Sequence, residues 1–183
     1  MIIQGGTGNG YAAKVDEHNR LHTKASLETA LSHASSHHGL AFSWNAVSAD
    51  IAGGETALLV CNDDPNKYLH IDSIYCWSDV PTAIDIHFPA HATWAGTAIT
   101  GVNLNRTSGI VALATAIADE TGQPTQGPIM TTLHTNELTG DQFNIMYDTH
   151  SAIILGYHDS IGIDIVADSA AFECTIVGWF EAV

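Results

Sequence analysis

The sequence predicts an all-β protein: an antiparallel, jelly-roll-like β-sandwich preceded by an extended N-terminal arm. Three observations favour this fold class. Apolar and polar residues alternate with period two in several short runs, turn-forming residues separate these runs at regular intervals, and the chain before about residue 40 is polar and glycine-rich. We therefore divide the 183-residue chain into an arm and connector (1–40) and a β-sandwich domain (41–183).

The arm has little with which to build a core of its own. Residues 8–25, GNGYAAKVDEHNRLHTKA, contain two large aliphatic side chains but three of the five basic residues of the chain. An extended arm of 25 residues reaches on the order of 80 Å, and such a segment usually gains its order from a neighbour. We expect it to mediate assembly, the alternative being a frayed terminus. The candidate assembly residues are Lys14, Val15, Asp16, Arg20, Leu21 and Lys24.

The next segments lead into the sandwich. Residues 26–39, SLETALSHASSHHG, fit either a short helix stopped by Gly39 or an irregular connector. A first strand is expected over 41–48. Residues 56–78 contain two strand-like runs around the turn signal NDDPN at 62–66, which predicts a β-hairpin.

Further strands follow from the same alternation. TAIDIHF, residues 82–88, places two isoleucines and a phenylalanine on one face and Asp85 and His87 on the other, as in a half-buried strand. IGIDIV, residues 161–166, repeats this pattern. Residues 111–120 fit either an alanine-rich helix or a strand. The other expected strands cover 98–104, 129–135, 142–147, 151–155 and 172–180.

Composition and charge exclude several classes of protein. A hydrophobic content of 45% with 14% charged residues argues against disorder. The formal charge of −15 argues against a broad grip on nucleic acid or anionic lipid. We identify no signal peptide and no run long enough to span a membrane. Three cysteines without a spaced motif predict buried free thiols and a reducing compartment: Cys61, Cys76 and Cys174.

Histidine is the only abundant reactive residue type, with eleven copies. On a helix His33 and His37 would share a face and could hold a metal ion, with Glu28 as the nearby carboxylate. Because the segment is rich in serine, we interpret it as a solvated connector. His87 and His91 lie roughly 13 Å apart if both are on a strand, too far to share one ion.

No other pattern supports a metal or cofactor. Spacing gives no support to a ligand set completed by His134, His150 or His158, and the absence of an HxH pair argues against a metal-dependent cupin enzyme. The oxygen-rich turn at 62–66 lacks the spacing and glycine of a calcium loop. Three aspartates near strand ends are expected to face solvent: Asp159, Asp164 and Asp168.

Catalytic motifs are also missing from the sequence. There is no GxSxG, no P-loop and no GxGxxG after a strand, so we name no catalytic, cofactor-binding or metal-binding residue. The glycosylation sequon at Asn105 is discounted, since one such triplet is common by chance. We expect core or interface packing, or alternatively an aromatic sugar-binding platform, from the four tryptophans: Trp44, Trp77, Trp94 and Trp179.

Four stretches together resemble small structural proteins of tailed bacteriophages. They are KVDEHNRLHTKA at 14–25, TALLVCNDDPNKYLHIDSI at 56–74, GVNLNRTSG at 101–109 and GYHDSIGIDIVADSAAFECTIVGWFE at 156–181. The resemblance covers most of the chain, and it is architectural, without a catalytic motif. The histidine-rich segment 33–38 departs from it.

The resemblance implies a non-enzymatic virion protein, a capsid decoration or cement protein assembled in the host cytoplasm. Its partners would be its own copies, as a trimer, and the major capsid protein or other virion proteins, with no direct contact to nucleic acid or membrane. Two alternatives remain open: a receptor- or glycan-binding module of a tail or fibre, and a histidine-metal enzyme on a jelly-roll scaffold.

Overall fold

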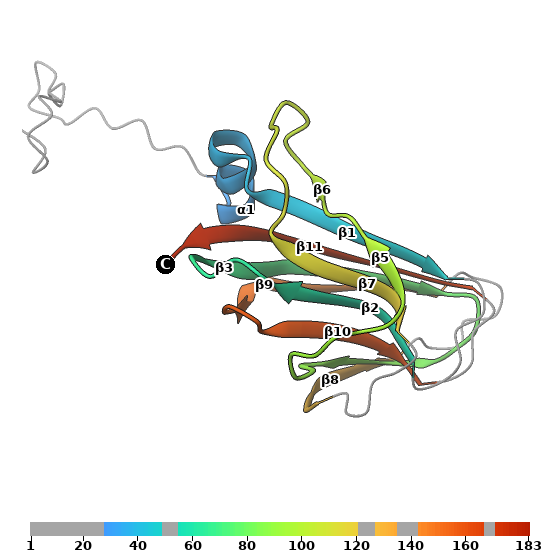
Figure 1. Ribbon diagram of the computed structural model, residues 1–183. Helices are drawn as coiled ribbons and strands as arrows, with labels where there is room; N and C mark the ends of the chain where they lie inside the picture. The colour runs from blue at the N-terminus through green and yellow to red at the C-terminus, as the bar shows by residue number, and fades with distance from the viewer. Residues whose placement is uncertain (1–27, 49–54, 121–126, 135–142, 167–170) are drawn as a thin grey trace, which may run out of the picture.

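The protein is an all-β sandwich of two antiparallel sheets that pack face to face (Figure 1). The computed structural model describes residues 28–48, 55–120, 127–134, 143–166 and 171–183. One sheet has the order β6-β1-β11-β3-β9 and consists of Val102–Asn103, Ala41–Ser48, Phe172–Ala182, Lys67–Ser78 and Phe143–Leu155. The other has the order β5-β7-β2-β10-β4-β8 and consists of Thr97–Ile99, Ala114–Glu120, Glu55–Asn62, Ser160–Ile165, Ala83–His87 and Ile129–His134.

The strand order is that of a jelly roll. The sets β1-β11-β3-β9 and β2-β10-β4-β8 face each other, and successive strands alternate between the two sheets from β1 to β4 and again from β8 to β11. Strands β5, β6 and β7 extend the edges of the two sheets. The predicted fold class is therefore confirmed.

The predicted hairpin at 56–78 is wrong, although both of its strands exist. Strands β2 and β3 belong to different sheets, so the turn at 63–66 crosses between layers instead of closing a hairpin. Turn chemistry specifies a reversal of the chain, but it does not specify whether the two strands pair or stack. The same ambiguity affects residues 98–104, which contribute β5 to one sheet and β6 to the other.

The core lies between the sheets and consists of the inward members of each alternating strand. The five-stranded sheet contributes Phe42, Trp44, Ile74, Ile176 and Phe180. The six-stranded sheet contributes Leu58, Val60, Ile84, Ile86, Ile161 and Ile163. Burying each large side chain of this kind stabilises the fold by roughly 1.5–3 kcal/mol. Residues 111–120 were ambiguous in the sequence; of these, Ala114–Glu120 form strand β7, whose alanines Ala116 and Ala118 face this core.

The two outer faces of the sandwich differ in exposure. On the six-stranded sheet the outward residues Leu59, Cys61 and His87 have no exposed surface, and Asp164 is also buried. The segment after β4 covers part of this face, where the Ser160 hydroxyl donates to the carbonyl of Pro89 (2.8 Å). Strand β10 is therefore buried on both faces, whereas β4 has half-buried Ala83 and Asp85 on its outer face and is fully buried there only at His87.

The expectation that three aspartates face solvent is only partly correct. Asp159 is exposed, as predicted, whereas the prediction for Asp164 is wrong, because Asp164 is 3% exposed in a strand that is buried on both faces. Asp168 lies outside the described residues. The outer face of the five-stranded sheet is open instead: Val47 is 70% exposed, Met146 61% and Tyr75 43%.

Candidate functional site

A short helical turn precedes the first strand and forms one wall of the candidate site. It consists of α1 (Ala30–His33) and the π-helical turn η1 (Ala34–His38). The Thr29 hydroxyl caps its start by accepting from the Ser32 N–H (3.1 Å), and Gly39 ends it in the left-handed conformation with φ 63°. Of the two alternatives left open by the sequence, the helix stopped by Gly39 is confirmed.

The π-helical turn gathers three histidines. A π-helix places residues i and i+5 in register, whereas an α-helix places i and i+4 there. As a result both His37 and His38 lie against His33, with ring centroids 4.7 and 5.1 Å away. The sequence predicted only the His33–His37 proximity.

Two asparagines, one at the end of β6 and one in the loop that follows it, bind this turn to the sandwich. The Asn103 amide donates to the carbonyl of Gly39 (2.8 Å), and the Asn105 amide donates to the carbonyl of Ser35 (3.0 Å). A Cβ on Gly39 would stand 2.3 Å from the Ser108 hydroxyl, so the loop also packs closely against the cap. The Asn105 amide of the discounted sequon is thus engaged in structure.

Glu28 lies next to two of these histidines. Its Oε2 is 3.4 Å from His33 Nδ1 and 3.4 Å from His37 Nε2. Its other oxygen, Oε1, accepts hydrogen bonds from the Ser36 hydroxyl (2.8 Å) and the Ser32 hydroxyl (3.3 Å). The Ser36 hydrogen bond, with the neighbouring histidines, lowers the pKa of Glu28 below its ordinary value, so the carboxylate is ionised at neutral pH.

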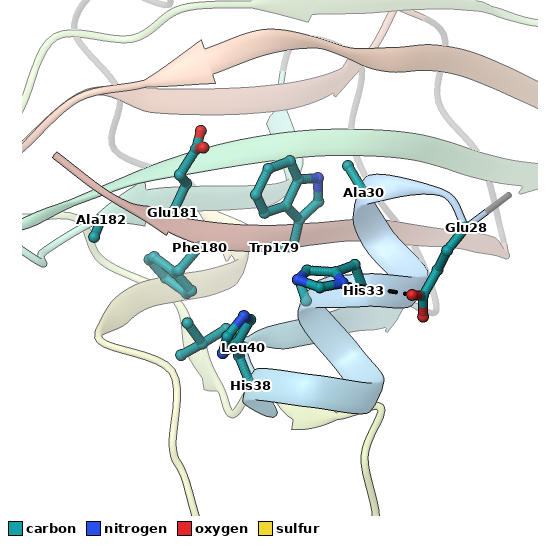
Figure 2. Close-up of a pocket in the computed structure, with 10 residues that line it drawn as sticks. Glu28, Ala30, His33, His38, Leu40, Trp179, Phe180, Glu181 and Ala182 are labelled. Carbon is teal, nitrogen blue, oxygen red and sulfur yellow. Dashed lines mark hydrogen bonds and ion pairs between the residues drawn. The ribbon is translucent and has the colours of Figure 1, made fainter. Parts of the chain in front are cut away.

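A groove of about 720 Å³ separates the helical turn from the end of β11 (Figure 2). Its apolar lining includes Leu40 and Phe180, while Glu28, His33 and Glu181 bring titratable groups to it. Trp179 also lines the groove; its indole N–H donates to the Ser151 hydroxyl (3.0 Å). The groove therefore combines apolar side chains with titratable groups in its lining.

A second histidine cluster lies over the outer face of the six-stranded sheet. His91 and His158 stack in parallel with ring centroids 3.9 Å apart, and Tyr157 stacks on His158 at 3.7 Å. His91 Nδ1 is 3.7 Å from the thiol of Cys61. No sequence pattern pointed to this cluster, because Cys61, His91 and the Tyr157–His158 pair are far apart along the chain.

The Cys61–His91 pair does not have the properties of an activated nucleophile. Burial, reinforced by the negative charge of Asp63, raises the pKa of Cys61 to about 12. The thiol is therefore neutral at physiological pH, whereas nucleophilic cysteines need a lowered pKa. The other two cysteines are also buried free thiols, as predicted, with Cys76 Sγ 3.5 Å from Cys174 Sγ and the pKa of Cys174 raised by burial.

The oxygen-rich turn at 62–66 uses its side chains internally. Asn62 accepts from the N–H of Asp64 (2.9 Å), and Asp64 in turn accepts from the N–H of Asn66 (2.9 Å) and from the Lys67 ammonium. Burial alone would raise the pKa of Asp64, but the hydrogen bonds from Lys67 and Asn66 outweigh it and lower the pKa. These contacts agree with a structural turn rather than a calcium loop.

The remaining sequence-based candidates are dispersed. His87 is buried against Gly162, while His91 is exposed and stacks on His158, so they do not form a pair. His150 pairs with Asp148 on the surface, and His134 ends β8. The six candidate assembly residues lie outside the described part of the chain: Lys14, Val15, Asp16, Arg20, Leu21 and Lys24.

Comparison with known proteins adds no relative. Neither family models, nor curated proteins, nor solved structures give a match to this chain. Within the described residues, no helix has the length and apolar character needed to cross a membrane.

Proposed function

We propose that this chain is a non-enzymatic structural protein that self-associates, with its N-terminal arm bridging to the acidic surface of a neighbouring copy. The proposed setting is the one that the bacteriophage resemblance implies: a virion, where the protein decorates and stabilises the capsid as a trimer in contact with the major capsid protein. The sandwich would supply a rigid body, and the arm would supply contact area without enlarging the fold.

The observation that carries this proposal is the division of charge along the chain. Residues 1–27 hold three basic and two acidic residues, a net charge of +1. Residues 28–183 hold two basic and 18 acidic residues, a net charge of −16. One of those two basic residues, Lys67, is already paired with Asp64. An acidic body therefore offers complementary surface to the arm of another copy.

The point where the arm joins the sandwich supports the same proposal. The described chain starts at Glu28, on the rim of the groove, beside the end of β11. Twenty-seven residues extend to at most about 90 Å, whereas the 13-residue strand β9 is roughly 43 Å long. The arm is thus long enough to reach well beyond its own sandwich.

Deletion of residues 1–25 tests the proposal. We expect the truncated protein to keep its far-ultraviolet circular dichroism and melting temperature, because the core of the described sandwich is built from residues between Leu40 and Phe180. Its oligomer, measured by native mass spectrometry and sedimentation, should dissociate at concentrations on the order of 10²-fold higher than the full chain, since avidity is lost. An unfolded truncated domain or an unchanged oligomer would contradict the proposal.

A charge variant separates electrostatic bridging from simple length. Replacing Lys14, Arg20 and Lys24 together by glutamate should weaken assembly, and the loss should be smaller at high salt, where charges are screened. The matched control exchanges the same residues between lysine and arginine, which keeps the charge and should keep assembly. Equal weakening in both triple variants would show that charge is not what the arm contributes.

A glycan-binding module is the second candidate, favoured by aromatic residues on the open face of the five-stranded sheet. Tyr75 is 43% exposed, and half-buried Trp77 lies two residues further along β3, on the same face. Beside them, the Asn45 amide donates to Thr175 Oγ1 (2.8 Å) and Glu173 Oε1 (3.0 Å). Flat rings flanked by fixed polar groups are suited to stacking against a sugar.

A glycan array distinguishes this candidate from the structural role. If the face binds sugar, Tyr75→Ala should reduce binding at least about tenfold, the effect of losing roughly 1.4 kcal/mol. Tyr68→Ala is the matched control, because Tyr68 is 40% exposed on the same strand but distant from Trp77. Absence of sugar binding by the unmodified protein, or equal loss in both variants, would exclude this candidate.

A further inference from the structure

We propose that Glu28, His33 and His37 form a binding site for a divalent transition metal ion of the zinc class. One ligating atom from each of the three lies within 4.8 Å of the others. All three are at the surface, at the junction between the arm and the sandwich, so an ion can enter from solvent. This inference is independent of the proposed assembly role.

The distances fit metal coordination better than direct hydrogen bonding. Glu28 Oε2 is 3.4 Å from a nitrogen of each histidine. A charge-assisted N–H···O bond is about 2.7–2.9 Å long, so 3.4 Å is long for an ion pair. Ligands bound at about 2.1 Å around a tetrahedral ion are separated by roughly 3.4 Å. The distances from Glu28 Oε2 to His33 Nδ1 and to His37 Nε2 therefore already match two edges of such a tetrahedron.

The carboxylate is held in place from its opposite side. Ser36 and Ser32 donate their hydroxyls to Oε1, which leaves Oε2 directed at the two imidazoles. The same sequence segment supplies both the ligands and these supporting donors. Hydrogen bonds of this kind orient ligating carboxylates in metal sites and affect metal affinity.

The histidines are also held on a fixed piece of backbone. The π-helical turn that carries His37 is tied to the sandwich by the Asn105 hydrogen bond to Ser35. Single π-helical turns inside helices occur frequently at functional sites. Because the turn already places the two rings 4.7 Å apart, binding an ion requires only side-chain adjustments.

The donor set indicates which ion would bind. Two imidazole nitrogens and one carboxylate oxygen suit zinc, cobalt, nickel or copper, whereas calcium and magnesium prefer sets of oxygen ligands. The side chains of His33 and His37 are 55% and 58% exposed, so the remaining coordination position faces water. The site would therefore hold the ion with three protein ligands and a solvent ligand.

Metal titration of the full-length protein tests this site. We expect isothermal titration calorimetry with zinc chloride to show one equivalent per chain whose affinity falls at least about tenfold in Glu28→Gln, His33→Gln and His37→Gln. Cobalt should give the visible absorption of a tetrahedral site, and each variant should lose it. All three residues are exposed, so the variants should keep the melting temperature of the metal-free protein.

Two controls make the assignment specific among eleven histidines. His38→Gln removes the neighbouring ring outside the ligand set, and His150→Gln removes another exposed histidine that has a carboxylate partner; both should keep the one-equivalent site. Ser36→Ala should weaken zinc binding about tenfold through the lost support of Glu28. The proposal is overturned if the unmodified protein binds no zinc, or if binding survives all three ligand substitutions.

Discussion

Replacing Asn62 by aspartate is expected to destabilise the protein by more than about 3 kcal/mol, a large share of the total stability of a domain. Asn62 is fully buried at the end of β2. Its amide nitrogen donates to the carbonyls of Lys67 (2.8 Å) and Leu155 (3.0 Å), and its amide oxygen accepts from the N–H of Asp64 (2.9 Å). One side chain therefore joins the ends of β2, β3 and β9 where the chain crosses between the sheets.

The expected effect is large because aspartate has the same shape as asparagine but replaces the donating amide nitrogen by an oxygen that accepts hydrogen bonds. The new oxygen would face two carbonyl oxygens, and the buried charge would add to neighbouring Asp63 and Asp64. An alanine at the same position leaves the partners unpaired, at about 1–3 kcal/mol for each buried group. We expect aspartate to be at least as damaging, since a buried charge without a partner costs more than a missing side chain.

The pH dependence of the Asn62→Asp variant provides an independent signature. To avoid a buried charge, the folded state should keep this carboxyl protonated, with its pKa raised above that in the unfolded chain. The unfolded state then binds fewer protons at neutral pH, so this group lowers stability as the pH rises and restores part of it as the pH falls. Urea unfolding at several pH values, followed by circular dichroism, measures this trend.

Asn66→Asp is the matched control, because it makes the same chemical change in the same turn. Asn66 is exposed, so the new charge remains hydrated, and the change should be within about 0.5 kcal/mol. If the two variants lose similar stability, the crossing between the sheets does not depend on the amide of Asn62.

The role of Asn62 illustrates how far the sequence alone leads. The first strand was predicted at 41–48, and both of these boundaries are confirmed. The alternation of apolar and polar residues was informative here because Phe42, Trp44 and Ala46 all face the core. The turn at 62–66 was also visible. Its function as a bridge between layers was not, because asparagine and aspartate are common in every kind of turn. Only the pairing of strands shows that Asn62 contacts the end of β9, 93 residues away in the chain.

Burial on both faces was hidden for a related reason. In β10 the pattern of IGIDIV indicated one buried face, yet Gly162 and Asp164 on the other face are buried as well. The residues that cover this face come from other parts of the chain, such as Pro89 above Ser160. Alternation describes the two faces of a strand, but it does not report which segments later pack on them.

The candidate metal site was visible in part. The spacing of His33 and His37 and the presence of Glu28 could be read from the sequence, but the serine content of the segment led us to interpret it as a solvated connector. The π-helical turn and the Ser36 hydrogen bond that aligns Glu28 depend on three-dimensional packing. By contrast, the stacked pair of His91 and His158 depends on topology alone, and no spacing rule could have found it.

Truncation of Trp44 is expected to cost about 3–5 kcal/mol as Trp44→Ala, through loss of buried apolar surface and creation of a cavity. Trp44 has the largest fully buried side chain among the described residues, and its ring centroid lies 6.1 Å from that of Phe42. Gly101 makes room for the indole, since a Cβ there would stand 2.6 Å from Trp44 Nε1. Alanine would leave this space empty in the centre of the sandwich.

Trp44→Phe should cost much less, under about 2 kcal/mol. Among the described residues the buried Nε1–H of Trp44 has no acceptor, so phenylalanine removes an unpaired polar group while it keeps most of the apolar contact. All four tryptophans lie in the described part of the chain, and Trp44 is the only fully buried one among them. Both substitutions should therefore also remove the most blue-shifted part of the tryptophan fluorescence emission. Trp94→Ala, at a half-buried site, is the control and should cost about 1 kcal/mol. Equal losses in Trp44→Ala and Trp94→Ala would mean that the space between the sheets is not the centre of stability.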